Sequence, residues 1–329
     1  MTDLCQEPVV TLDDVRAAAE RIAGRVVRTP LLPFAAAEPR RPLWIKPESL
    51  QPTGAFKLRG AFNAILQHLD EARSRGVVTH SSGNHARAVA WVAHELGLRA
   101  VIVIPDVAPA VKVEAVRRLG AEVVIVTPDQ RDTRAFELAT EHGFLMVPPY
   151  DDPAVVAGQG TIGLEIVADL PDANQVLVPV SGGGLIGGIS TAVKALSPAT
   201  RVIGVEPELA ADAAESLRTG QRVFWTTEQT YRTVADGLRT TSVGEIPWRQ
   251  IRAYVDDVVT VTEEQILDAV RLLAGDARLV VEPSGAVTYA AYLHRPDRLA
   301  MDGKTVAVVS GGNVALETFA DIVGGPSSA

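Results

Sequence analysis

Short runs of β-branched and other apolar residues alternate along the chain with longer stretches in which apolar positions recur every three or four residues. This rhythm is typical of strand–helix–strand units that build a mostly parallel sheet. The uninterrupted apolar runs predict strands buried on both faces, at the centre of a sheet. Such strands are expected at 100–104, 122–126, 175–180, 202–205 and 305–309.

Helical periodicity fills the intervals between these strands. It predicts helices at 12–22, 55–69, 85–96, 111–119, 134–141, 185–196, 262–273 and 314–322. A glycine follows several of them, as at Gly97, Gly120 and Gly143, where a left-handed residue is a common helix end. The predicted fold class is therefore α/β.

The segment 76–147 contains three compact strand–helix repeats and is followed by turn-forming prolines and aspartates. We expect residues 76–150 to form a small domain. Residues 1–75 and 151–329 would then form a large domain.

Composition narrows the class of protein. The 329 residues are 47% hydrophobic and 22% charged, which excludes a disordered or fibrous chain. Acidic residues outnumber basic ones by 40 to 31, so the net charge of −9 argues against a surface for nucleic acid or for an anionic membrane. A small molecule is the expected partner.

The single cysteine, Cys5, permits no intrachain disulfide and no thiolate zinc site. The first residues lack the basic and apolar regions of a signal peptide, and no window reaches the roughly 18 apolar residues of a membrane span. A cytoplasmic protein is expected.

One lysine stands out among the basic residues. Only five of the 31 are lysines, and Lys57 lies among apolar neighbours at the start of a predicted helix that Thr53 can cap. Lysine, unlike arginine, can lose its proton and form an imine. The alternative is a lysine whose stem packs on the helix while its ammonium group reaches water.

A glycine-rich loop, residues 181–188, lies between a predicted strand and a predicted helix. Its backbone amides and the helix dipole are suited to binding a phosphate. Gly182, Gly184 and Gly187, with Glu206 about 20 residues on, also satisfy the dinucleotide-binding fingerprint of a nicotinamide dehydrogenase. A third interpretation is that the glycines serve close packing of helix and strand.

Two further polar loops follow predicted strands, at 81–85 and 310–313. Each offers amide and hydroxyl donors suited to a carboxylate or a ring heteroatom, although each alone is also typical of a simple helix cap. Ligands of α/β proteins bind beyond the carboxyl ends of the strands. A dehydrogenase explains only one of these loops.

Taken together, these motifs resemble the fold-type II pyridoxal-phosphate enzymes, and among them the serine/threonine dehydratase and serine racemase group. The resemblance extends from about residue 12 to residue 323. It implies two open, twisted, mostly parallel sheets flanked by helices, as in the tryptophan synthase beta subunit. It also implies pyridoxal 5′-phosphate as the cofactor and leaves an NAD-dependent dehydrogenase as a distant alternative.

The resemblance assigns roles to individual residues. Lys57 falls on the Schiff-base lysine, which also moves the α-proton, and Phe56 falls beside the cofactor ring. The substrate carboxylate is assigned to Ser81, Ser82, Gly83, Asn84 and His85. Within that loop Asn84 also reaches the phenolic oxygen of the cofactor, and Ser82 is the acid or base opposite the lysine.

The remaining cofactor contacts follow from the same resemblance. The phosphate is assigned to Gly182, Gly183, Gly184 and Leu185, the pyridine nitrogen to Ser310, and a further cofactor contact to Gly237. Thr240 is expected to shape the pocket for the substrate side chain. The chain departs from the usual family pattern after His85, where Ala86 and Arg87 replace glycine and glutamine.

A divalent cation is also implied, held by Glu206, the carbonyl of Ala210, and Asp212. Oxygen ligands favour Mg²⁺ or Ca²⁺. From spacing alone, these carboxylates could equally complement the dipole of a helix with Pro207 in its first turn.

The expected activity is that of an ammonia-lyase, a dehydratase that eliminates water from a β-hydroxy amino acid such as L-threonine or L-serine. The products are a 2-oxo acid and ammonia. Serine racemase and 3-hydroxyaspartate dehydratase are the alternatives within the family. A homodimer is the expected assembly.

Overall fold

Two β-sheets organise the chain, whose computed structural model describes residues 7–34, 39–81, 83–108 and 110–325. The larger sheet has the strand order β1 (Leu32–Phe34), β2 (Leu43–Pro47), β10 (Thr305–Val309), β7 (Gln175–Pro179), β8 (Arg201–Pro207), β9 (Asp257–Val261). The smaller has the order β5 (Glu122–Val126), β4 (Ala100–Pro105), β3 (Val77–His80), β6 (Leu145–Met146). Only β1 and β2 pair antiparallel, so the predicted α/β fold with two mostly parallel sheets is confirmed.

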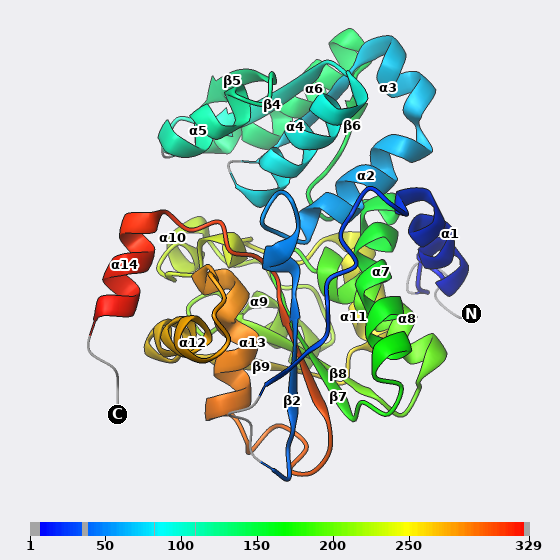
Figure 1. Cartoon of the computed structure of the whole chain (residues 1–329). Coiled ribbons are helices and arrows are strands. Elements are labelled where there is room, and N and C mark those ends of the chain that lie inside the picture. The colour runs from blue at the N-terminus through cyan, green and yellow to red at the C-terminus, as the bar shows by residue number, and fades with distance from the viewer. Residues whose placement is uncertain (1–6, 35–38, 82, 109, 326–329) are drawn as a thin grey trace.

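Helices cover both faces of the larger sheet, because its strands are apolar on both sides. Val306 and Val308 of β10 pack on the side of α7 (Pro153–Asp169), α8 (Gly184–Leu196) and α11 (Glu245–Tyr254). Ala307 and Val309 pack on the opposite side, with α12 (Glu263–Asp276) and α13 (Pro283–His294). Figure 1 shows these two groups of helices on either side of the sheet. The remaining helices of this half are α1 (Leu12–Ile22), α2 (Lys57–Gln67), α9 (Asp212–Thr219), α10 (Thr227–Thr230) and α14 (Leu316–Gly324).

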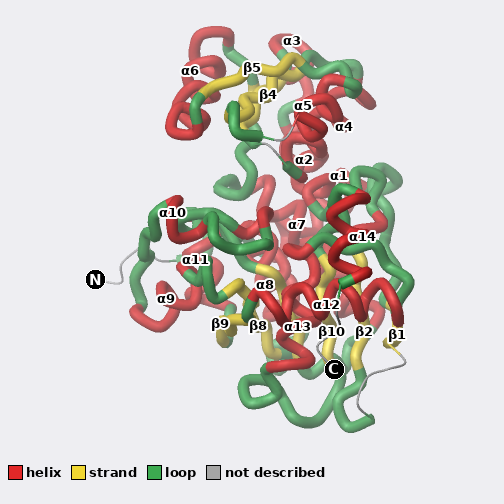
Figure 2. The backbone as a smooth tube through the Cα atoms, turned by 90° about the vertical axis from the view of Figure 1, so that its left-hand side faces the viewer, coloured by secondary structure: helices red, strands yellow, loops and turns green. Residues whose placement is uncertain are grey.

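The smaller sheet is built in the same way. Ile102 and Ile104 of β4 pack with α4 (Asn84–Leu96) and α5 (Ala110–Arg117), whereas Val101 and Val103 pack with α6 (Arg131–His142). The short α3 (Leu69–Arg75) precedes β3. Figure 2 shows this sheet and its helices gathered at one end of the molecule. The expected boundaries of a small domain at 76–150 stay a prediction.

One predicted strand has a different environment from the one expected. The run 122–126 does form β5, but the interpretation of a strand buried at the centre of a sheet is wrong. β5 pairs only with β4, so it lies at the edge of the sheet, and Ile125 is 46% exposed. The other four predicted strands are confirmed as β4, β7, β8 and β10.

All eight predicted helices are present, with ends that shift by up to three residues. Gly97 and Gly143 end α4 and α6 with φ of 65° and 68°, as expected of left-handed caps. The long helices α7 and α13 were not predicted. Both are buried over most of their length.

A buried ion cluster joins α2 to the larger sheet and to α7. It consists of Lys46, Glu48, Arg59 and Glu165, and Arg59 binds Glu48 at 2.8 Å and Glu165 at 2.6 Å. Lys46 Nζ lies 2.6 Å from Glu165 Oε2. Burial alone would raise the pKa of Glu48, but the Arg59 guanidinium outweighs it and holds that pKa below its usual value. Two cations and two carboxylates thus balance each other inside the protein.

Candidate active site

The predicted loops converge at the carboxyl end of the larger sheet. The backbone N–H of Phe56 donates to the carbonyl of Ser310 at 3.0 Å, and that of Gly312 donates to Gly54 at 2.9 Å. The segment before Lys57 is therefore paired with the loop that follows β10. The glycine loop follows β7, the neighbour of β10 in the sheet.

Lys57 is the first residue of α2, but Thr53 does not cap that helix. The helix begins after Phe56 with no side-chain cap, and the Thr53 hydroxyl points to the carbonyl of Ala55 at 3.5 Å. Gly54, with φ of 75°, turns the chain between Thr53 and the helix. The expected cap is therefore wrong, because this turn redirects the threonine.

The Lys57 amine has no carboxylate partner within the described residues. Its Nζ donates to the backbone carbonyl of Pro149 at 2.5 Å and lies 5.0 Å from the centre of the Phe56 ring. Burial lowers the pKa of this amine to about 8. A substantial neutral fraction near neutral pH makes it available as a nucleophile and as a base.

The glycine loop presents unused amides at the start of α8. Gly183, with φ of 86°, precedes the helix, and the amides of Gly182, Gly183, Gly184 and Leu185 donate no hydrogen bond within the described residues. A Cβ added to Gly182 would lie 2.3 Å from the Tyr150 ring, so this glycine also serves packing. The free amides at a helix N-terminus fit a phosphate group.

Tyr150 connects the lysine to this loop, because it follows Pro149, whose carbonyl accepts the Lys57 hydrogen bond. Neither contact was found from the sequence. A backbone acceptor has no residue-type signal, and the family resemblance, which places Tyr150 near the cofactor ring, indicates no contact with the glycine loop.

The residues assigned to the cofactor ring and the substrate side chain occupy nearby loops. Ser310 follows β10 and is 4% exposed, and its hydroxyl makes no hydrogen bond within the described part of the chain. The amide of Gly237 donates to Ser284 Oγ at 2.8 Å, and Thr240 Oγ1 lies 2.9 Å from Ser181 Oγ. Thr240 is therefore adjacent to the beginning of the glycine loop.

The 81–85 loop begins α4. Ser81 Oγ accepts from the amide of Gly83 at 3.2 Å, and Ser82 lies outside the described residues. The His85 ring contacts the carbonyl of Val147 at 2.9 Å, and burial, with the nearby Lys57, lowers its pKa to about 3. A neutral, buried ring leaves the backbone amide of His85 as its donor for a ligand.

Asn84 contacts a carboxyl group that the sequence analysis missed. Its Nδ2 donates to Glu282 Oε1 at 2.7 Å. Burial and the charge of Asp236 raise the pKa of Glu282 to about 7. The available signal was a single acidic residue at the end of an apolar run, just before Pro283 at the start of α13.

Glu206 and Asp212 form a pair of buried carboxyl groups beside β8. The Glu206 oxygens accept from the amides of Ala213 and Ala214 at 3.1 and 2.8 Å, and Asp212 Oδ2 has no partner in the described residues. Burial raises the pKa of both groups, that of Asp212 to about 7. The carbonyl of Ala210 accepts no hydrogen bond from the described residues, so these oxygens fit a hard cation.

The helix expected to begin at Pro207 starts instead at Asp212, because Pro207 is the last residue of β8. Glu206, in β8, accepts hydrogen bonds from amides in the first turn of α9.

Known proteins resemble this chain over nearly its full length. The family described as "Pyridoxal-phosphate dependent enzyme" matches residues 22–311. The chain is 39% identical over 322 residues to L-threo-3-hydroxyaspartate ammonia-lyase of Saccharomyces cerevisiae, covering 96% of this chain and 97% of the relative. It is 39% identical over 320 residues to the catabolic L-threonine dehydratase of Escherichia coli K12, with 96% of each chain covered. The structure of maize serine racemase superposes with a TM-score of 0.88 at 38% identity, covering 94% of this chain and 95% of that one.

Proposed function

This chain belongs to the pyridoxal-phosphate dependent enzyme family, and from that membership we propose that it is an ammonia-lyase acting on a β-hydroxy amino acid. The reaction removes water and then ammonia from a substrate such as L-threonine or L-serine and leaves a 2-oxo acid. The family match also explains the glycine loop without a dinucleotide, so the dehydrogenase interpretation is set aside.

The observation that carries the proposal is the Lys57 amine. This amine is partly buried, lacks an acidic partner in the described residues, and has a pKa of about 8. It binds the carbonyl of Pro149, and the next residue, Tyr150, packs against Gly182 of the glycine loop. An amine that only bound water or a surface carboxylate would keep an ordinary pKa. Covalent attachment of a cofactor requires this neutral amine.

The cofactor would be held by groups that are free in the structure. The amides of 182–185 would bind its phosphate, Ser310 would face its pyridine nitrogen, and Phe56 would lie beside its ring. Gly237 and Asn84 are proposed as further contacts. When bound, pyridoxal phosphate supplies a ring that withdraws the electron pair released at the substrate α-carbon.

The chain's own residues would then act on the substrate. The loop of Ser81, Ser82, Gly83, Asn84 and His85 would bind the substrate carboxylate and thereby orient the α-hydrogen toward Lys57. Lys57 Nζ, neutral once the substrate amine has replaced it, would accept the α-proton. Loss of the β-hydroxyl with a proton gives water, and hydrolysis of the resulting enamine gives the 2-oxo acid and ammonia.

The possible substrates of the lyase differ in the side chain that the enzyme must bind. Thr240, beside Ser181, is proposed to contact it. The relatives include an ammonia-lyase for L-threo-3-hydroxyaspartate as well as a threonine dehydratase, so both substrates are compared in the test. Similarity to maize serine racemase supports racemisation as the second candidate, with Ser82 as the acid or base opposite Lys57.

The test is an assay of the purified protein with pyridoxal phosphate and L-threonine, L-serine or L-threo-3-hydroxyaspartate. We expect a yellow protein that forms 2-oxo acid and ammonia in equal amounts from at least one of them. Formation of D-serine from L-serine without any 2-oxo acid would refute the lyase activity and support the racemase activity. A colourless protein that binds NADH would overturn both.

We also propose that Glu206, the Ala210 carbonyl and Asp212 bind Mg²⁺ or Ca²⁺ in a structural role, because Asp212 Oδ2 is buried without a partner in the described residues. Exhaustive chelation should lower the melting temperature. Mg²⁺ at about 100 times its Kd should restore about 2.7 kcal/mol, which corresponds to roughly 4 °C for a chain of this length. Differential scanning calorimetry in EDTA and in Mg²⁺ measures the change.

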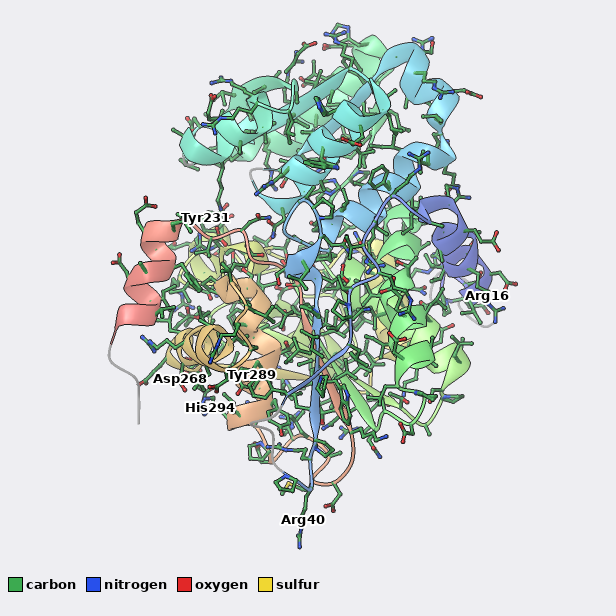
Figure 3. The ribbon with its side chains drawn as sticks, viewed as in Figure 1. Arg16, Arg40, Tyr231, Asp268, Tyr289 and His294 are labelled. Carbon is green, nitrogen blue, oxygen red and sulfur yellow. The ribbon has the colours of Figure 1, made fainter. Side chains whose placement is uncertain are left out.

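Asp212→Asn should abolish the response to Mg²⁺. Asp268 of α12 offers a matched control, because it is another buried carboxyl with an unpaired oxygen. Its ion-pair partner among the described residues is His294, 3.8 Å away on α13, and no second carboxylate pairs with it there (Figure 3). Asp268→Asn should keep the full response. An identical melting temperature of the unmodified protein in EDTA and in Mg²⁺ would refute the proposed cation site.

We further propose that the enzyme works in the cytoplasm as a homodimer on a small amino acid, without a nucleic-acid or membrane surface. The net charge of −9 argues against a surface for nucleic acid or for an anionic membrane. In the described part of the chain no helix is both long enough and apolar enough to cross a bilayer.

A further inference from the structure

Four polar side chains form a continuous chain of hydrogen bonds between the two halves of the molecule. Arg87 Nη1 donates to Asn313 Oδ1 at 2.6 Å, and Asn313 Nδ2 donates to Asn84 Oδ1 at 2.7 Å. Asn84 Nδ2 in turn donates to Glu282 Oε1 at 2.7 Å. Arg87 and Asn84 begin α4 beside the smaller sheet, whereas Asn313 and Glu282 belong to the larger half. We call these four residues the amide relay.

All three bonds of the amide relay run in one direction, from the cation to the carboxyl group. An isolated asparagine amide can turn over, because it carries a donor and an acceptor of similar shape. Arg87 can only donate, and Glu282 can only accept once it is ionised, above its pKa of about 7. Turning over the amide of Asn313 would place donor against donor at Arg87, and turning over that of Asn84 would place acceptor against acceptor at Glu282.

Neighbouring contacts strengthen this orientation. The second hydrogen of Asn313 Nδ2 is donated to the carbonyl of Thr53 at 2.8 Å, four residues before Lys57. Gly54 must be a glycine here, because an added Cβ would lie 2.5 Å from Asn313 Oδ1. The amide relay is therefore tied to the segment that carries the lysine, and hydrogen bonds in a chain polarise one another.

The fixed orientation leaves one hydrogen of Asn84 Nδ2 unused within the described residues. We propose that Arg87 and Glu282 are positioning residues that hold this remaining N–H ready for an oxygen atom of the cofactor. The inference rests on the proposed function, which places the cofactor beside Asn84. Arginine at position 87 matters because a glutamine there could present either its oxygen or its nitrogen and would set no direction.

The test compares Arg87→Gln, Arg87→Lys and Glu282→Gln. Lysine only donates, so Arg87→Lys should preserve the direction, whereas both glutamine variants should lose it. We expect Arg87→Gln and Glu282→Gln to weaken pyridoxal phosphate binding to the apoenzyme about ten- to a hundredfold, as is usual for a hydrogen bond to a charged group. Arg87→Lys should stay within about threefold of the unmodified protein. Equilibrium titration of the apoenzyme measures the affinity.

A second readout separates orientation from mere stability. A hydrogen-bond donor to the phenolic oxygen of the cofactor favours the ionised form of that oxygen. Loss of the donor should therefore raise the pH at which the visible absorption of the bound cofactor changes. Arg99→Gln is the matched control, because Arg99 also donates a side-chain hydrogen bond to a carboxylate, at 2.7 Å to Glu122, but lies outside the amide relay. It should leave both the affinity and the absorption profile unchanged.

The proposal is overturned if Arg87→Lys is impaired as much as Arg87→Gln, or if Arg99→Gln reproduces the effects of Arg87→Gln and Glu282→Gln. Failure of the proposed function looks different, because the unmodified protein would then neither bind pyridoxal phosphate nor turn yellow. In that case melting temperatures of the apoprotein still test the amide relay. Arg87→Gln and Glu282→Gln should be clearly non-additive, and additive effects would refute the coupling.

Discussion

Replacing Lys57 with alanine should lower the rate of 2-oxo acid formation by about 10⁴-fold or more. General base catalysis alone contributes about 10²–10⁴-fold, and the variant also loses the covalent attachment of the cofactor. Lys57→Arg should fail equally, because a guanidinium neither loses its proton nor forms the required bond. The rate of each variant is measured at saturating pyridoxal phosphate. In the unmodified enzyme, borohydride treatment followed by mass spectrometry should locate the reduced cofactor on Lys57.

Lys304→Arg is the matched control. Lys304 pairs with Asp172 at the surface, at 2.5 Å, so an arginine there keeps the same interaction. Its activity should equal that of the unmodified enzyme. Normal turnover by Lys57→Arg would contradict the assignment of the lysine.

The lowered pKa of Lys57 gives the direction of the pH dependence. With a pKa of about 8, about one tenth of the amine is neutral at pH 7 and about nine tenths at pH 9. The rate at which the apoenzyme gains visible absorption on mixing with the cofactor should therefore rise through pH 8 and level off above pH 9. A rate that still rises tenfold per pH unit toward pH 10 would indicate an ordinary, exposed lysine.

The second large effect is expected on stability, from breaking the buried ion cluster. Glu48→Gln removes one of two buried carboxylates and leaves the Arg59 guanidinium partly uncompensated, and both side chains are fully buried. Such a loss costs about 3–5 kcal/mol, or roughly 4–7 °C in melting temperature. Urea unfolding followed by circular dichroism measures the free energy of unfolding.

Glu122→Gln supplies the comparison at the surface. Glu122 also accepts two hydrogen bonds from an arginine, at 2.7 and 3.0 Å from Arg99, but the two side chains are 55% and 57% exposed. Exposed pairs contribute about 0–1 kcal/mol. Equal losses in Glu48→Gln and Glu122→Gln would show that burial of the cluster has no special weight.

The sequence allowed five of the ten strands in the described residues to be predicted, because uninterrupted apolar runs mark strands covered on both faces. The same signal misplaced β5, since an apolar run does not reveal whether a second strand pairs with it. The helices α7 and α13 were not predicted, for a related reason. A helix that is apolar all round has no contrast between a polar and an apolar face, so its period of 3.6 residues disappears.

The site shows a similar division. Lys57 and the three loops were visible as motifs, because each is a short run of residues with distinctive chemistry. Glu282 was not visible, since its partner Asn84 lies 198 residues away in the sequence. The carbonyl of Pro149 was equally hidden, because every residue carries one and only the fold decides which of them faces the lysine.

The position of β10 bears on the order in which the chain can fold during synthesis. β10 comprises Thr305–Val309, yet it lies between β2 and β7, two strands made much earlier. A ribosome builds the chain from its N-terminus, so the larger sheet stays divided, with a gap at its centre, until β10 has been made. All four strands of the smaller sheet lie between residues 77 and 146, so that sheet can form long before. The loop carrying Ser310 and Asn313 follows β10 directly, so the nascent chain can complete the proposed cofactor site only after β10 has been made.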